Sequence, residues 1–132
     1  MKEPRWVPRE VVEATHEELL VRYGGLSGIR DEGLLDSALR RPEHLFAYAD
    51  PDVFDLASAY AAGIVKNHPF LDGNKRSGFM TAYTFLEANG MEFLASEEEV
   101  VLQTLGLAAG KVSERAYAAW LKKSCRRRRP VR

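Results

Sequence analysis

The nine residues from His68 to Arg76 constrain the fold most, because they separate two apolar segments that have helical spacing. Between residues 53 and 64, apolar residues recur at intervals of three and four, and a second apolar run covers residues 79–86. Pro69 disfavours helical backbone at the residue before it. We therefore expect His68 to lie where one helix ends, and a second helix to begin a few residues later.

The polar residues of this segment favour an anion-binding site at the start of the second helix. Gly73 can adopt backbone conformations that other residues avoid, and the first amides of a helix have no partner within the helix. Lys75 and Arg76 fall in the first turn, where cations oppose the helix dipole unless an anion lies beside them. A phosphate group would satisfy both the amides and the cations.

Two further groups of the segment suggest chemistry on a hydroxyl group. His68 has a side chain whose ordinary pKa lies near neutrality, which suits a general base. Asp72 can cap the helix, or it can hold Mg²⁺, which takes one or two carboxylates together with substrate phosphates. The alternative is that the segment has only a structural role. In that case Asp72 only caps the helix, His68 packs on the core, and Lys75 and Arg76 are solvated.

The segment resembles the signature of the Fic/Doc superfamily, His-Pro-Phe-x-x-Gly-Asn-x-Arg, and within it the death-on-curing (Doc) toxins. His68, Phe70, Asp72 and the run Asn74-Lys75-Arg76 match the Doc form of the motif. The segment from Arg22 to Arg41 resembles the first part of Doc-like toxins, so the resemblance covers nearly the whole chain except about the last eight residues. Fic enzymes that transfer AMP usually carry Gly at the position of Lys75, whereas the Doc branch carries Lys.

The resemblance implies a protein kinase that moves the γ-phosphate of ATP to a threonine of elongation factor Tu and so arrests translation. It makes His68 the general base. Asp72 and Asn74 would be further catalytic residues that organise Mg²⁺ and phosphate, and Asp72 would hold the Mg²⁺. Gly73, Lys75 and Arg76 would then bind the nucleotide phosphates. Catalysis of phosphoryl transfer by positioning and charge neutralisation is consistent with this set of groups.

Two other functions stay open at this point. An adenylyltransferase would use the same residues with the α-phosphate facing the base, and a non-catalytic module would keep only the fold and an antitoxin-binding groove. The chain has no Ser/Thr-x-x-x-Glu-Gly/Asn string of the kind by which many Fic proteins inhibit themselves. The resemblance therefore implies a Phd-like antitoxin as a partner, whose C-terminal segment folds into a groove.

The rest of the 132-residue chain predicts an all-α fold: a compact bundle of about six helices in one domain, residues 1–125. The helices are expected near residues 8–23, 31–41, 52–67, 73–89, 97–109 and 113–125. We expect His16 and His44 to lie at the surface or half-buried, without a catalytic role. No apolar run reaches the length of a membrane span and the N-terminus lacks a signal-peptide layout, so we expect a cytoplasmic protein.

Two connecting segments carry further hypotheses. Residues 43–51 correspond in position to the flap that aligns the target peptide in Fic-type proteins, which would make Leu45, Phe46 and Tyr48 docking residues. The alternative is an ordinary connection whose side chains pack on the core. Five of the 19 basic residues fall in the last seven positions. We expect residues 126–132 to form a disordered, solvated tail, in preference to a nucleic-acid contact, because no aromatic residue or Gly is interleaved.

Overall fold

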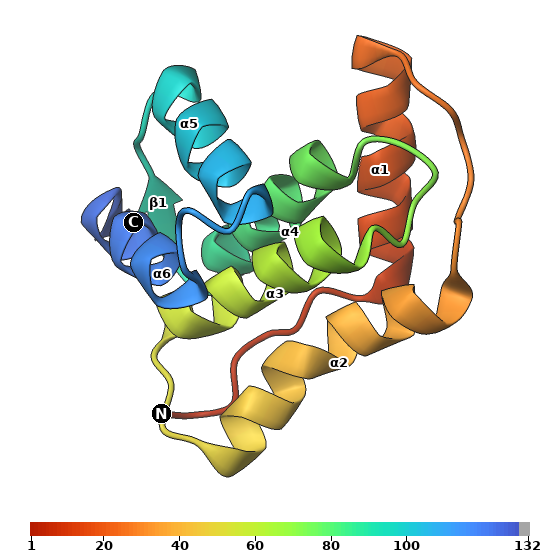
Figure 1. Ribbon diagram of the computed structural model, residues 1–132. Helices are drawn as coiled ribbons and strands as arrows, with labels where there is room; N and C mark the ends of the chain where they lie inside the picture. Colours follow the sequence, from red (N-terminus) through yellow and green to blue (C-terminus); the bar gives the residue numbers. More distant parts are fainter. Residues whose placement is uncertain (130–132) are drawn as a thin grey trace.

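The fold is arranged around two antiparallel neighbours, α3 and α4 (Figure 1). The His68–Arg76 segment forms the loop between them and the first residues of α4. The structure is a computed structural model and describes residues 1–129. Its helices are α1 (Arg9–Tyr23), α2 (Glu32–Tyr48), α3 (Val53–Asn67), α4 (Asn74–Ala88), α5 (Glu97–Ala108) and α6 (Glu114–Lys123). The six helices predicted from the sequence are confirmed. Two short strands, β1 (Met91–Phe93) and β2 (Cys125–Arg127), accompany them.

Helix α3 is the most deeply buried element, because every residue from Leu56 to Val65 is inaccessible to solvent. It packs against α2, α4 and α6, and its many alanines let these neighbours approach closely. Helix α4 lies in the middle of the molecule in Figure 1, but it is buried along one face only. The core of the protein is therefore centred on α3. Because His68 caps this buried helix, the helix fixes the position of the His68 backbone.

Helix α2 continues past Pro42 to Tyr48, so the prediction that it ends near Arg41 and is followed by a flap is wrong. Pro42 removes one helical hydrogen bond, which normally ends or bends a helix. Here Pro42 is buried, and Phe46 packs edge-on against Trp6 at 5.7 Å between ring centroids. Leu45 and Phe46 pack against the core, as the alternative expected, whereas Tyr48 is 89% exposed. Apolar burial thus outweighs the cost of the proline.

The arginine-rich segment is ordered where the structure describes it, contrary to the expectation of a solvated tail from residue 126. Strand β2 pairs antiparallel with β1, and Arg126 lies opposite Glu92 and forms an ion pair with it. Arg128 donates to the backbone carbonyls of Glu87 and Met91 near the end of α4. The sequence does not predict this strand, because three residues are too few to show the alternating pattern of a strand and their partner lies 34 residues earlier. The last three residues of the predicted tail, 130–132, lie outside the described part of the chain.

The contact between α3 and α4 depends on a glycine, and replacing it tests the packing. A Cβ at Gly78 would lie 2.7 Å from Val65 Cγ2 and 3.1 Å from the Ala61 carbonyl oxygen. We expect Gly78→Ala to lower the free energy of unfolding by about 1–3 kcal/mol through overpacking. Gly33→Ala is the control, because its Cβ meets nothing closer than 3.4 Å. Urea denaturation that shows Gly78→Ala to be as stable as wild type would contradict this packing.

The single cysteine, Cys125, lies half-buried at the start of β2, and burial raises the pKa of its thiol to about 11. Only the thiolate reacts with alkylating agents. We expect iodoacetamide at pH 8 to label the folded protein at least about tenfold more slowly than the urea-unfolded protein, after allowing for the higher nucleophilicity of a weakly acidic thiol. Mass spectrometry over time measures both rates, and equal rates would show that Cys125 is accessible and unperturbed.

Candidate active site

The segment predicted to carry the chemistry is a tight loop between the end of α3 and the start of α4. His68 caps the C-terminus of α3 with left-handed backbone angles, φ 50° and ψ 54°. Gly73 precedes α4 and is also left-handed, with φ 77°. The prediction that His68 lies where a helix ends is confirmed. The side chains of His68, Asp72, Lys75 and Arg76 are all exposed, so each can reach a ligand.

The loop is held in shape by the side-chain amide of Asn74. Its Oδ1 accepts a hydrogen bond from the backbone N–H of Phe70, and its Nδ2 donates to the carbonyl of the same residue, both at 3.0 Å. Asn74 is only 8% exposed and Phe70 only 1%. The polar atoms of the amide are thus engaged with the backbone of the loop, which gives Asn74 a positioning role in the described structure.

His16 of α1 supports the same loop, and the sequence analysis missed it. Its Nε2 lies 2.7 Å from the backbone carbonyl oxygen of Asp72, and its ring stacks on Phe70 with centroids 3.8 Å apart. His16 is 2% exposed, so the expectation of a surface or half-buried residue is wrong. The signal available in the sequence was its spacing: His16 follows Val12 by four residues, and both lie on the inner face of α1.

The connection between α1 and α2, residues 24–31, lies along the loop and pairs with it at one point. Ile29 and Phe70 form an antiparallel bridge, and the Leu71 N–H donates to the carbonyl of Gly28. Gly25 comes so close that a Cβ there would lie 2.9 Å from Asp72 Oδ2. The segment that pairs with the His68–Arg76 loop is therefore the connection of residues 24–31, which contains three glycines. Residues 43–48, which the sequence analysis assigned to a flap, belong to α2.

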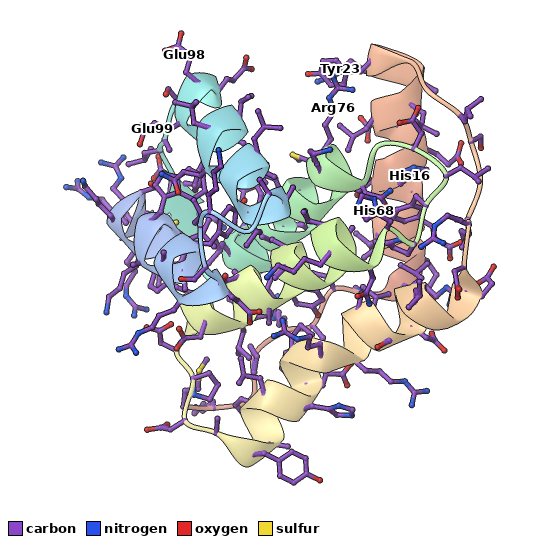
Figure 2. The ribbon with its side chains drawn as sticks, viewed as in Figure 1. His16, Tyr23, His68, Arg76, Glu98 and Glu99 are labelled. Carbon is purple, nitrogen blue, oxygen red and sulfur yellow. The ribbon has the colours of Figure 1, made fainter. Side chains whose placement is uncertain are left out.

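The start of α4 is strongly cationic. Its first turn contains no acidic residue, and neither Lys75 nor Arg76 forms an ion pair within residues 1–129. The Arg76 guanidinium lies over the Tyr23 ring, 4.5 Å from its centroid. Figure 2 shows Tyr23, Arg76, His16 and His68 on the side of the molecule where α1 faces the loop. Together with the free amides of the first turn, these cations favour an anionic ligand.

A pocket of about 230 Å³ lies between the second half of α1 and the loop. It is lined by His16, Leu19, Leu20, Tyr23, Gly24, Gly25, Asp72, Gly73 and Arg76. Pockets that enclose a whole small-molecule ligand usually measure about 300–1,000 Å³. This one therefore suits a part of a ligand such as a phosphate chain, and Arg76 is the cation that lines it.

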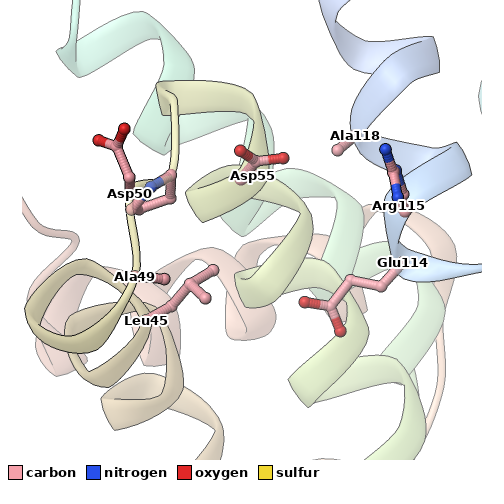
Figure 3. Close-up of a pocket in the computed structure, with 8 residues that line it drawn as sticks. Leu45, Ala49, Asp50, Asp55, Glu114, Arg115 and Ala118 are labelled. Atoms are coloured by element: carbon pink, nitrogen blue, oxygen red, sulfur yellow. The ribbon is translucent and has the colours of Figure 1, made fainter.

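A larger cleft of about 350 Å³ lies elsewhere, between the end of α2 and the beginnings of α3 and α6 (Figure 3). Its charged residues are Asp50, Asp55, Glu114 and Arg115, and no residue of the motif lines it. Three carboxylates against one guanidinium repel a phosphate. The smaller pocket beside the motif is therefore the better candidate for nucleotide chemistry.

Asp72 presents one carboxylate at the edge of the pocket. Its Oδ1 accepts a hydrogen bond from the Gly73 N–H at 2.9 Å, and its Oδ2 accepts one from the Leu26 N–H at 3.3 Å. Within residues 1–129 no three His, Cys, Asp or Glu side chains lie close enough together to hold a metal ion. A single carboxylate is compatible with Mg²⁺ when phosphates and water supply the remaining ligands.

None of the helices within residues 1–129 is sufficiently long and apolar to cross a membrane.

Comparison with known proteins agrees with this geometry. Residues 6–86 match the model of the Fic/DOC family. The chain is 33% identical to "Protein kinase doc" of Escherichia phage P1 over 117 residues, which are 88% of this chain and 91% of that protein. It is 39% identical to "Toxin Doc" of Mycolicibacterium smegmatis over 77 residues, which are 57% of this chain and 59% of that protein. The family match includes α1, which supplies His16, and the complete loop from His68 to Arg76, and we conclude that the chain belongs to the Fic/DOC family.

Proposed function

We propose that this protein is a Doc-type toxin and a protein kinase that transfers the γ-phosphate of ATP to a threonine of elongation factor Tu. The observation that carries the proposal is an exposed histidine at the end of α3, which residues 69–73 join to a helix start that carries two cations without an ion pair in the described residues. The 33% identity to a protein kinase over most of both chains supports the same reaction.

The polar groups of the His68–Arg76 segment divide the tasks of this reaction among them. His68 removes the proton from the threonine hydroxyl as the oxygen attacks the γ-phosphorus, and the bond from that phosphorus to the bridging oxygen of ADP breaks. Lys75, Arg76 and the amides after Gly73 bind the phosphates and neutralise their charge. Asp72 would hold Mg²⁺, which when bound supplies further neutralisation of phosphate charge.

An adenylyltransferase is the second candidate, because the same loop could present the α-phosphate to His68. Lys75 stands where AMP-transferring members usually carry Gly, and this favours the kinase. A non-catalytic module that only binds an antitoxin is a third candidate. Two exposed cations at a helix N-terminus oppose the helix dipole. In a module without an anionic ligand, the Arg76 guanidinium would keep its contact with the Tyr23 ring, but no group would offset the unfavourable position of Lys75.

The partner that restrains the toxin is proposed to be a Phd-like antitoxin. No self-inhibitory string is present in the sequence, so inhibition would come from another chain. Helix α5 leaves Val101, Leu102 and Leu105 substantially exposed, at 54%, 70% and 48%. Such an aliphatic surface is of the kind that an amphipathic partner helix covers on binding.

The decisive experiment incubates the purified protein with elongation factor Tu, Mg²⁺ and ATP, in parallel reactions labelled at the α- or γ-phosphorus. A phosphate-sized mass gain and γ-label on one threonine would support the kinase. An AMP-sized gain with α-label would identify an adenylyltransferase instead. If neither label appears, binding of ATP at millimolar concentration distinguishes an enzyme with another target from the non-catalytic module.

A further inference from the structure

Arg30, in the connection between α1 and α2, holds the end of α3 at three successive carbonyl groups. Its Nη2 donates to the Asn67 carbonyl at 2.8 Å and its Nε to the His68 carbonyl at 2.7 Å. Its backbone N–H donates to the Pro69 carbonyl, also at 2.7 Å. The last carbonyls of a helix lack partners within the helix and form the negative end of its dipole, so a cation is well placed there.

The residue at the centre of this contact has an unusual backbone. His68 is the only non-glycine residue with a positive φ within residues 1–129. Left-handed backbone is unfavourable for L-residues, and it persists only where the surroundings determine it. The planar guanidinium forms two hydrogen bonds to successive carbonyls, and one of them is to the carbonyl of His68 itself. This backbone conformation sets the direction of the Cα–Cβ bond from which the imidazole projects.

We propose that Arg30 is a positioning residue, which fixes the left-handed backbone of His68 and thereby aims its imidazole at the substrate hydroxyl. This inference rests on the proposed function of His68 as the base. Arg30 acts through His68, because its described contacts are with the backbone of the loop and it does not line the pocket beside Arg76.

Three variants separate the guanidinium from the rest of the connection. Arg30→Met removes the two side-chain hydrogen bonds but keeps the backbone N–H of residue 30 and its bond to Pro69. Arg30→Lys keeps the charge, yet its single nitrogen cannot reproduce the planar pair of bonds. Arg40→Met is the matched control, since Arg40 is an exposed arginine of α2 that forms no side-chain hydrogen bond or ion pair within residues 1–129.

Steady-state kinetics give the first test. A misplaced catalytic group costs up to about 10²-fold in rate. For Arg30→Met we expect kcat to fall about 10- to 100-fold while KM for ATP changes less than about twofold, because the phosphate-binding groups are untouched. Arg30→Lys should retain an intermediate kcat, and Arg40→Met should equal wild type. An equal loss of ATP affinity, or an unchanged kcat in Arg30→Met, would overturn the proposal.

Nuclear magnetic resonance gives a second test that does not need kinase activity. The chain has three histidines, so protein labelled with ¹³C and ¹⁵N in histidine gives a short, assignable set of signals. In Arg30→Met the backbone Cα and carbonyl shifts of His68 should move away from left-handed values, whereas those of His16 and His44 stay constant. Unchanged His68 shifts would refute the inference, and equal changes at His16 would show general loosening of the loop, which also refutes it. If wild type transfers no phosphate while His68 alone shifts, the proposed function fails and the positioning contact stands.

Discussion

Replacing His68 with asparagine is expected to lower kcat for phosphoryl transfer by about 10²- to 10⁴-fold, the usual contribution of a positioned general base. Asparagine is the sharpest replacement because it tolerates the left-handed backbone that residue 68 adopts, φ 50°, better than alanine does. It removes the base and leaves the loop in shape. Binding of ATP should stay within about twofold of wild type, because the phosphate-binding groups lie beyond the loop.

The control for this prediction is Arg76→Ala, which removes one of the two cations at the start of α4. Loss of a charged hydrogen bond to phosphate should weaken ATP binding by about tenfold or more, measured by calorimetry. Comparison of His68→Asn with Arg76→Ala therefore separates the loss of turnover from the loss of ATP binding. A His68→Asn protein that keeps wild-type kcat would show that His68 is not the base, whatever its effect on stability.

Removing the amide of Asn74 is expected to have the largest effect on stability of the variants at the site. In Asn74→Ala the N–H and the carbonyl of Phe70 both lose their partner in a buried environment. Each unsatisfied buried group costs about 1–3 kcal/mol, so we expect the free energy of unfolding to fall by at least about 2 kcal/mol in urea denaturation. Activity should fall with it, because the loop would no longer fix the distance from His68 to α4.

The chain provides a matched control for this experiment. Asn89 donates from Nδ2 to the Phe85 carbonyl in a partly buried hydrogen bond. It also forms a two-point contact with a backbone residue, since it accepts from the Arg5 N–H and donates to the Arg5 carbonyl. That contact is exposed, so water can replace the amide in Asn89→Ala. We expect a loss of about 1 kcal/mol or less there. If both variants lost the same stability, burial of the loop around Phe70 would not be the cause.

Sequence patterns were sufficient for the helices because each helix carries its own local signals. Ser96 and Ser113, for example, accept hydrogen bonds from the first turns of α5 and α6, as N-cap serines do. The end of α2 was not predictable in this way. Pro42 indicates a break locally, and only the burial of Phe46 against Trp6 decides that the helix continues. Pairing of Arg126 with Glu92 is likewise non-local.

By itself, the sequence determined six helices, the position of His68 at the end of one of them, and the cationic start of the next. These are consequences of spacing and of local backbone preferences, which act over a few residues. Tertiary structure alone decided how the loop is held: His16 lies 56 positions before Asp72, and Arg30 lies 38 before His68. A histidine in a helix and an arginine in a turn look like ordinary surface residues until packing brings α1 and the connection after it against the loop. The spacing of His16 after Val12 indicates the inner face of α1. It does not indicate the partner, because contacts between residues far apart in the chain depend on distance in space.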